Sequence, residues 1–306
     1  MRILLPRPRG FCAGVDMAIQ ALERALERFG SPIWAYHQIV HNRHVVASFE
    51  ARGVRFVDDL VEVPVGSTVV FSAHGVAPSI RVEAAARELR VIDTTCPLVT
   101  KVHSEAKRFA EKGFTVVLIG HEGHDETVGV MGEAGDRVVL VETLEDIERL
   151  VVEDPGRVVL LTQTTLSVAD TAAMVARLKA RFPSIVMPPK QDICYATENR
   201  QRAVSATAVE ADLVLVVGSR NSSNSNRLVD EARRMGTQAH LIDGAEDIDE
   251  VWLKGVSTLL VTSGASAPEL LVRGVVDWVR GRHDVTVEER ATAVEDTRFR
   301  LPVLVR

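Results

Sequence analysis

Apolar and polar residues follow a helical period over residues 13–29, directly after Cys12. The apolar positions recur every three or four residues and the charged positions fall between them, which is typical of an amphipathic helix. The apolar positions are Val15, Ala18, Ile19, Leu22, Leu26 and Phe29. Gly30 supplies a C-terminal stop. The pattern therefore predicts a helix with a thiol at its N-terminus, between Gly10 and Gly14.

The same arrangement occurs twice more along the chain. Cys96 precedes Pro97, and proline is favoured at the first position of a helix. Cys194 precedes a less regular helical pattern. Each helix is followed by an apolar strand segment, namely 32–36, 114–120 and 212–218, and then by a polar stretch and further strands. A repeat of this length changes the expected fold, because each copy is one structural unit.

Strands and helices alternate within each copy, which predicts parallel sheets with helical crossovers. The third copy lacks the strand that leads to a cysteine, and residues 1–13 supply it. The predicted fold class is therefore α/β, with three small pseudo-threefold-related domains. Their expected boundaries are 14–96, 97–193, and 194–281 together with 1–13, followed by a C-terminal tail over 282–306.

Composition limits the classes of function. The chain has 306 residues, 46% of them apolar, and a formal net charge of -6, which is typical of a soluble globular protein. No apolar run approaches the ~20 residues of a membrane helix, and no signal-peptide core is present. We therefore expect a cytoplasmic protein without a membrane partner. The mild acidity argues against nucleic-acid binding, and the odd cysteine count argues against a disulfide framework.

The three thiols are expected to converge, because parallel α/β sheets place ligands at the carboxyl ends of their strands. A helix N-terminus lowers the pKa of a thiol, and three thiolates repel one another unless a cation joins them. Zinc and an iron–sulfur cluster both satisfy this requirement, and three small buried apolar side chains are the plain alternative. The absence of a closely spaced cysteine pair favours the iron–sulfur cluster over zinc.

Polar residues recur at nearly matched distances after the cysteines. One set comprises His41, His124 and Asn224, and a second comprises His74, Thr164 and Ser266. These side chains and the Gly- and Ser-rich loops around them can hydrogen-bond anionic oxygens, which favours a small phosphorylated substrate. No P-loop motif is present.

Two further features concern single residues. Glu126 follows His124 by two residues and could carry protons beside a metal centre. The remaining histidines are expected to have structural roles; they are His37, His44, His103, His121, His240 and His283.

Taken together, the motifs carry a resemblance. In chain order they are PRGFCAGV, VHNR, FSAHGV, TCPLVTKVH, IGH-x-GH-x-E, TQTTLS, DICYAT-x-NRQ, GS-x-NSSNSNRL and SGASAP. From residue 1 to about residue 280 the chain resembles the 4-hydroxy-3-methylbut-2-enyl diphosphate reductase family. The resemblance implies three α/β domains around a central 4Fe-4S cluster, one per chain. The cluster's three cysteine ligands match Cys12, Cys96 and Cys194.

The resemblance also implies roles for individual residues. Glu126 matches a proton relay, Thr164 helps to place the substrate hydroxyl, and His124 belongs to the same catalytic group as well as to the diphosphate site. The diphosphate-binding positions match His41, His74, His124, Ser222, Ser223, Asn224 and Ser266. One departure lies next to the relay, because Asp125 stands where many relatives have proline.

The implied reaction is the reductive dehydroxylation of (E)-4-hydroxy-3-methylbut-2-enyl diphosphate to isopentenyl diphosphate and dimethylallyl diphosphate, in the non-mevalonate isoprenoid pathway. Two electrons pass through the cluster, whose open iron binds the substrate oxygen. A ferredoxin or a flavodoxin is the expected electron donor, because the chain has no nicotinamide or flavin motif.

Other interpretations remain open from the sequence. Quinolinate synthase has a similar plan of three domains and a three-cysteine cluster, but the Ser-Ser-Asn run at residues 222–224 and the histidine set favour the reductase. An iron–sulfur sensor or electron carrier needs no ring of phosphate donors. A structural zinc protein is the third alternative, and metal analysis distinguishes it.

Overall fold

The computed structural model describes residues 1–306 and is an α/β chain with three sheets, in which every strand pair is parallel. The predicted fold class is therefore confirmed. The chain divides into two compact units. Unit 1 comprises Met1–Asp16, Val40–Ala51 and Tyr195–Arg298, and unit 2 comprises Met17–Ile39, Arg52–Cys194 and Phe299–Arg306.

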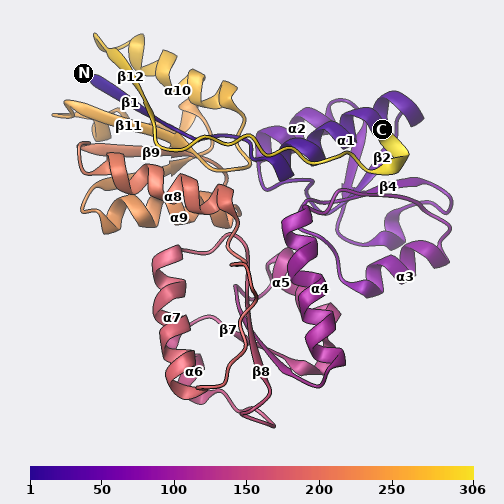
Figure 1. Ribbon diagram of the computed structural model, residues 1–306. Helices are drawn as coiled ribbons and strands as arrows, with labels where there is room; N and C mark the ends of the chain where they lie inside the picture. Colours follow the sequence, from indigo (N-terminus) through magenta and orange to yellow (C-terminus); the bar gives the residue numbers. More distant parts are fainter. The chain divides into compact units, whose positions relative to one another are not determined.

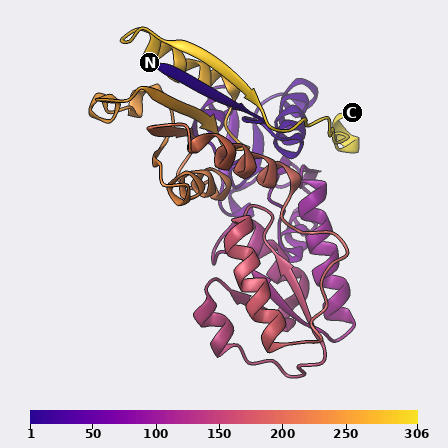
Figure 2. The same ribbon diagram turned by 60° about the vertical axis from the view of Figure 1, so that its left-hand side comes forward.

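Unit 1 contains a five-stranded sheet in the order β10-β9-β11-β1-β12. The strands are β1 (Arg2–Arg7), β9 (Leu213–Val217), β10 (Gln238–Ile242), β11 (Thr258–Ser263) and β12 (Thr286–Ala291). Both views show β12 beside the N-terminal strand β1 (Figures 1 and 2). The segment 282–306, which lies outside the predicted repeat, thus contributes an edge strand to this sheet. The boundaries of the three expected domains stay a prediction.

The two faces of this sheet are covered by different helices. Along β1, Ile3 and Leu5 pack with apolar residues of α10 (Glu269–Arg280). Leu4 points to the other face, where it packs with residues of α8 (Tyr195–Ala208) and α9 (Ser223–Arg234). Because alternate residues of a strand face opposite sides, the uninterrupted apolar sequence of β1 fits a strand that is buried on both faces. Unit 1 also includes α2 (Arg43–Glu50).

Unit 2 contains the other two sheets. The first has the order β3-β2-β4-β5 and is packed against α3 (Pro78–Ala86). Its strands are β2 (Ile33–Tyr36), β3 (Val54–Val57), β4 (Thr68–Phe71) and β5 (Arg90–Asp93). The second has the order β7-β6-β8, with the strands β6 (Thr115–Ile119), β7 (Val138–Val141) and β8 (Val158–Thr162). Five short 3-10 helices complete the elements: Leu60–Glu62, Gly135–Arg137, Ala245–Asp247, Glu250–Leu253 and Val303–Val305.

The three-stranded sheet of unit 2 also has a core on each face. Apolar residues of α4 (Pro97–Glu111) and α5 (Asp125–Ala134) cover one face. Residues of α6 (Leu144–Arg149) and α7 (Val168–Arg181) cover the other. The helices α4 and α5 carry Cys96 and His124 at their N-terminal ends, so this packing fixes the direction in which both ends point.

All three cysteines stand directly before a helix, as the sequence predicts. Cys12 precedes α1 (Ala13–Phe29), Cys96 precedes α4, and Cys194 precedes α8. On α1, Val15, Ala18 and Leu22 are buried, while the other predicted apolar positions are half-buried. The buried face is broader than the prediction, because it also includes Met17, Ala21 and Ala25. None of the helices is both long and apolar enough to cross a membrane.

Candidate functional site

The three cysteines share one backbone contact. All are half-buried, and none forms a disulfide. The N–H of each donates to a carbonyl in a loop that follows the end of a strand. The bonds are Cys12 N to Ala265 O (3.2 Å), Cys96 N to Ala73 O (3.0 Å) and Cys194 N to Thr164 O (3.1 Å). These loops carry Ser266, His74 and Thr164, which form the second predicted set of binding residues. The repeat in the sequence therefore corresponds to a repeated local contact.

In unit 1, the N-terminus of α9 presents hydroxyl and amide groups. Ser222 is the N-cap residue, and its side chain accepts a hydrogen bond from the backbone N–H of Ser225 (3.3 Å). Asn224 is buried; its Oδ1 accepts from Ala265 N (2.8 Å) and its Nδ2 donates to Thr197 Oγ1 (3.3 Å). A helix N-terminus with such donors is a ready site for an anion. Ser223 is the first residue of this helix and is half-buried.

Ser266 connects this helix end to a second loop of the same unit. Its Oγ donates to the carbonyl of His41 (2.9 Å) and lies 3.5 Å from Ser222 Oγ. The next residue, Asn42, caps α2 by accepting from the N–H groups of His44 and Val45, both at 3.1 Å. The predicted residues His41, Ser222, Ser223, Asn224 and Ser266 therefore all belong to one small region of unit 1.

Two glycines permit this close packing. A Cβ added to Gly218 would lie 2.2 Å from Ser225 Oγ, and one added to Gly264 would lie 2.0 Å from the same atom. Ser225 is fully buried and bonds to Ser222. Because neither distance allows a side chain, the strand-end loops after β9 and β11 need glycine to approach the helix that carries Ser222 and Asn224.

In unit 2, Glu126 and Thr164 form a buried pair across two loops. Glu126 lies in the first turn of α5 and is 1% exposed. Its Oε1 accepts from the backbone N–H of Thr164 (2.7 Å), and its Oε2 accepts from the Thr164 hydroxyl (3.0 Å). The carbonyl of Thr164 accepts from Cys194 N (3.1 Å). The predicted proton relay is thus two hydrogen bonds away from a predicted metal ligand.

Burial raises the pKa of Glu126 to about 7. The two hydrogen bonds from Thr164 act in the opposite direction, and the negative charge of Asp192 raises the pKa further. Desolvation dominates because neither oxygen of the carboxylate contacts a cation. A carboxyl group with this pKa is both proton donor and proton acceptor near neutral pH, which is the property that acid–base catalysis requires.

His124 caps the helix that carries Glu126. Its Nδ1 accepts from the backbone N–H of Glu126 (3.2 Å), so Nδ1 is not protonated in this contact and Nε2 carries the ring proton. The ring of His74 lies against it edge to face, with 5.9 Å between the ring centroids. Two histidines predicted to bind the diphosphate therefore lie side by side within unit 2.

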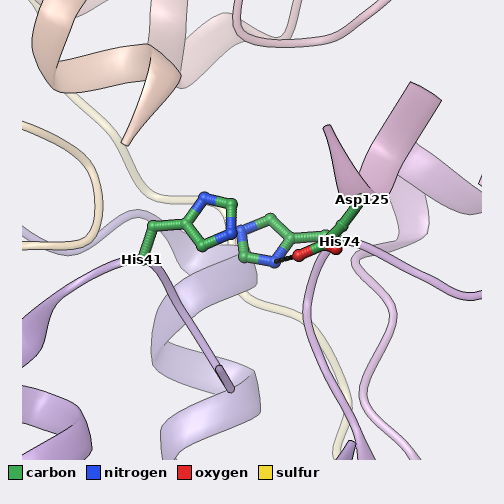
Figure 3. A group of neighbouring side chains, drawn as sticks. All are labelled: His41, His74 and Asp125. Atoms are coloured by element: carbon green, nitrogen blue, oxygen red, sulfur yellow. Dashed lines mark ion pairs between the residues drawn. The ribbon is translucent and has the colours of Figure 1, made fainter. Parts of the chain in front are cut away.

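Asp125 is a charged member of this region that sequence reasoning did not select. Its Oδ2 lies 3.8 Å from His74 Nδ1 (Figure 3), and its Oδ1 lies 2.6 Å from His37 Nδ1. The hydrogen bond to Asp125 raises the pKa of His37. The same carboxylate therefore lies beside two histidines, with His37 at hydrogen-bond distance and His74 farther away. The sequence indicates a role for Asp125 only through its position between His124 and Glu126, because its partner His37 lies far away along the chain.

The predicted residues consequently fall into two groups, each with internal contacts. Unit 1 holds Cys12, His41, Ser222, Ser223, Asn224 and Ser266. Unit 2 holds Cys96, Cys194, His74, His124, Glu126 and Thr164. The first group offers neutral hydrogen-bond donors at a helix N-terminus. The second offers two adjacent imidazoles and a carboxyl group that titrates near neutral pH. The chemistry of the two groups fits an anionic substrate and a proton transfer, respectively.

Comparison with known proteins gives a consistent result over the whole chain. The profile of a family described as LytB protein matches residues 3–280. A protein of Mycolicibacterium gilvum named 4-hydroxy-3-methylbut-2-enyl diphosphate reductase is 56% identical over 306 residues, covering 100% of this chain and 92% of the relative. A protein of the same name from Nocardia farcinica is 56% identical over 302 residues, covering 98% of this chain and 90% of the relative.

Solved structures agree with the sequence comparison. The structure of the E-1-hydroxy-2-methyl-but-2-enyl-4-diphosphate reductase from Plasmodium falciparum superposes with a TM-score of 0.96 at 38% identity, covering 99% of this chain and 96% of the other. A structure described as (E)-4-hydroxy-3-methyl-but-2-enyl diphosphate reductase, the terminal enzyme of the non-mevalonate pathway, gives a TM-score of 0.64 at 29% identity, covering 92% of this chain and 99% of the other.

The burial of Glu126 predicts a pH-dependent stability. Below pH 4.5 the carboxyl is protonated in both the folded and the unfolded chain. Between pH 4.5 and about 7 the unfolded chain loses this proton while the folded chain keeps it, so the free energy of unfolding falls. Relative to Glu126→Gln, the wild type should lose on the order of 3 kcal/mol across this interval and nothing further above it.

Urea unfolding of the metal-free, reduced chain at pH 4.5, 6 and 8 measures this effect. The difference between the two proteins removes the contribution of every other titrating group. A difference in free energy of unfolding that is the same at all three pH values would show that Glu126 titrates at its ordinary pKa.

Proposed function

Because the chain belongs to the LytB protein family, we propose that its reductase chemistry takes place at a three-cysteine cofactor site served by Glu126 and Thr164. The activity is the reduction of 4-hydroxy-3-methylbut-2-enyl diphosphate. The named relatives thus confirm the function expected from the sequence, rather than the alternatives of a quinolinate synthase or an electron carrier. The observation that carries the proposal is the buried contact between Glu126 and Thr164, whose carbonyl accepts from the Cys194 N–H.

The donor set of the chain fits an iron–sulfur cluster. Cys12, Cys96 and Cys194 would be its ligands, since each stands at a helix N-terminus, where a thiolate is favoured. The Cys96 side chain makes no capping hydrogen bond to its helix. A 4Fe-4S cluster bound by three cysteines would pass on two electrons from an external donor, one at a time, and would offer one iron that is open to a substrate oxygen.

The diphosphate of the substrate is assigned to hydroxyl, amide and imidazole donors. In unit 1 these are Ser222, Ser223 and Asn224 at the N-terminus of α9, with Ser266 and His41 beside them. In unit 2 they are His74 and His124, whose rings are adjacent. Hydroxyl, amide and imidazole groups hold phosphate oxygens at fixed positions and so align the carbon skeleton before reaction.

Glu126 then supplies the proton for the leaving oxygen. With a pKa of about 7 it still holds a proton in neutral solution, and Thr164 fixes the direction of its carboxyl group. The C4–O bond of the substrate breaks, and the oxygen leaves as water once it has taken up this proton. Two electrons and a second proton, delivered to one of two allylic carbons, complete either isopentenyl diphosphate or dimethylallyl diphosphate.

The electrons come from a separate protein. We assign this role to a ferredoxin or a flavodoxin, because the sequence contains no nicotinamide or flavin motif of its own. Three cysteines outside any disulfide fit a reducing compartment, so we place the reaction in the cytoplasm.

Glu126→Gln tests the proton relay. The variant should keep its iron and bind the substrate, because the amide retains the size of the carboxyl, yet its turnover should fall by about 10²–10⁴-fold. Turnover is measured with (E)-4-hydroxy-3-methylbut-2-enyl diphosphate and a reduced viologen dye, with anaerobic wild type as the reference. Wild-type turnover should fall as the pH rises through about 7, because the carboxyl group then loses the proton that it donates.

The control for this variant is Glu122→Gln, an exposed carboxyl in the same HEGHDET segment. It should turn over at the wild-type rate. Undiminished turnover by Glu126→Gln would remove Glu126 from the mechanism, and absence of turnover by the fully loaded wild type would remove the reductase itself.

Cys96→Ser tests the ligand assignment. Anaerobically purified wild type should contain about four iron and four sulfide per chain, as a 4Fe-4S cluster requires. The serine variant should lose most of this iron, because a hydroxyl replaces a thiolate. The measurement is iron and acid-labile sulfide analysis of both proteins. A fully loaded, active Cys96→Ser protein would contradict the ligand assignment, and so would zinc in place of iron in the wild type.

A further inference from the structure

A buried arginine binds the chain segment that leads to Cys12. Arg200 lies on α8 and is 1% exposed. Its Nε and Nη2 both donate to the carbonyl of Gly10, at 3.2 and 2.6 Å, and its Nη1 lies 3.1 Å from the carboxylate of Glu295. Gly10 has a positive φ of 74°, which few other residues adopt without strain. The guanidinium therefore fixes a turn two residues before the cysteine.

The charge and the geometry of this contact make it specific for an arginine side chain. A buried positive charge is tolerated only with a counter-charge and a full set of hydrogen bonds, and Glu295 and the carbonyls of Gly10 and Ala196 supply them. The planar guanidinium provides two parallel donors to a single carbonyl, which an ammonium group does not. Together with the Cys12 N–H, which bonds to Ala265 O, the contact holds the cysteine segment at two points.

A lysine performs the equivalent task before Cys194. Lys101 lies on α4, five positions after Cys96. Its Nζ donates to the carbonyls of Lys190 (2.8 Å) and Gln191 (3.3 Å) and to the Asp192 carboxylate (2.8 Å). The other oxygen of Asp192, which is buried, accepts from Thr162 N at the end of β8 (3.0 Å).

The two contacts follow one rule. In each, a cation on the helix after one cysteine binds main-chain carbonyls just before the next cysteine of the circular repeat. Lys101 follows Cys96 and binds the segment of Cys194, whereas Arg200 follows Cys194 and binds the segment of Cys12. Neither cation is among the residues assigned to substrate or cofactor.

We propose that Arg200 and Lys101 are positioning residues that hold the Cys12 and Cys194 segments, respectively, in the conformation that receives the cofactor. This inference rests on the proposed function for the identity of the cofactor, but the positions of the thiols are a property of the chain itself. Each cation acts on one cysteine and leaves the other two in place.

The test uses the full, metal-free and reduced chain, and measures the alkylation rate of each cysteine by iodoacetamide with mass spectrometry. Arg200→Met should raise the rate at Cys12 about tenfold and leave Cys96 and Cys194 unchanged, because the lost charge-assisted hydrogen bonds allow that segment to open. Lys101→Met should raise the rate at Cys194 by a similar factor and leave Cys12 unchanged.

Matched controls come from the same helices. Arg202 on α8 is exposed and pairs only with Glu198, one turn earlier, and Lys107 on α4 is exposed. Arg202→Met and Lys107→Met should leave all three rates at the wild-type value. If Arg200→Met does not fold, Arg200→Lys replaces it; the ammonium keeps the charge beside Glu295 but loses the paired donors, so Cys12 alone should still react faster.

An equal increase at all three cysteines, or no increase at any, would overturn the proposal, because either result means that the cations stabilise the chain generally or not at all. A second readout is iron release from the reconstituted protein to a chelator, which should be about tenfold faster in both variants. If wild type takes up no iron, the proposed cofactor is wrong, whereas the pattern of alkylation still decides whether the two cations position the thiols.

Discussion

Parallel strand pairing is the constraint on which the site depends. A parallel strand must be followed by a crossover, so the chain leaves the carboxyl end of each strand and enters a helix at the same edge of the sheet. In this protein the strand-end loops and the helix N-termini therefore meet, and the cysteine N–H groups bond to the loop carbonyls of Ala73, Thr164 and Ala265. Thiols, hydroxyls and imidazoles collect there because no other edge of a parallel sheet presents unpaired helix N–H groups.

The repeat explains why so much of this arrangement could be predicted. Parallel sheets, cysteines at helix N-termini and polar strand-end loops all follow from local periodicity and from residues that recur in the same phase. The helix after Cys12 begins where its apolar spacing begins, and its charged face is exposed. The spacing of apolar residues predicts the width of the buried face less well. Met17, Ala21 and Ala25 are as buried as the bulkier residues that define the pattern.

A local pattern of this kind does not predict contacts between segments that are distant in the sequence. The sequence places Glu126 beside His124, but its pKa is set by its burial in the fold and, in the opposite direction, by hydrogen bonds from Thr164, which lies in another loop. Asp125 has its role only through His37 and His74. The strand β12 has an alternating, charged sequence that is unlike the apolar strands of the repeat, and only its pairing with β1 shows that it belongs to the sheet.

The groups that contact a charged side chain decide whether it serves structure or chemistry in this protein. Arg200 pairs with Glu295 and Lys101 pairs with Asp192, and each cation fixes a segment of chain. Glu126 is buried and accepts hydrogen bonds from the neutral N–H and hydroxyl of Thr164. A matched ion pair gains nothing by exchanging a proton, whereas a carboxyl group that only neutral donors contact retains its proton up to neutral pH. Burial raises the pKa of both Glu126 and Asp192, but Lys101 opposes this effect at Asp192. The absence of a cation beside Glu126 is therefore the physical reason why this carboxyl group, and not Asp192 beside Lys101 or Glu295 beside Arg200, is suited to proton transfer.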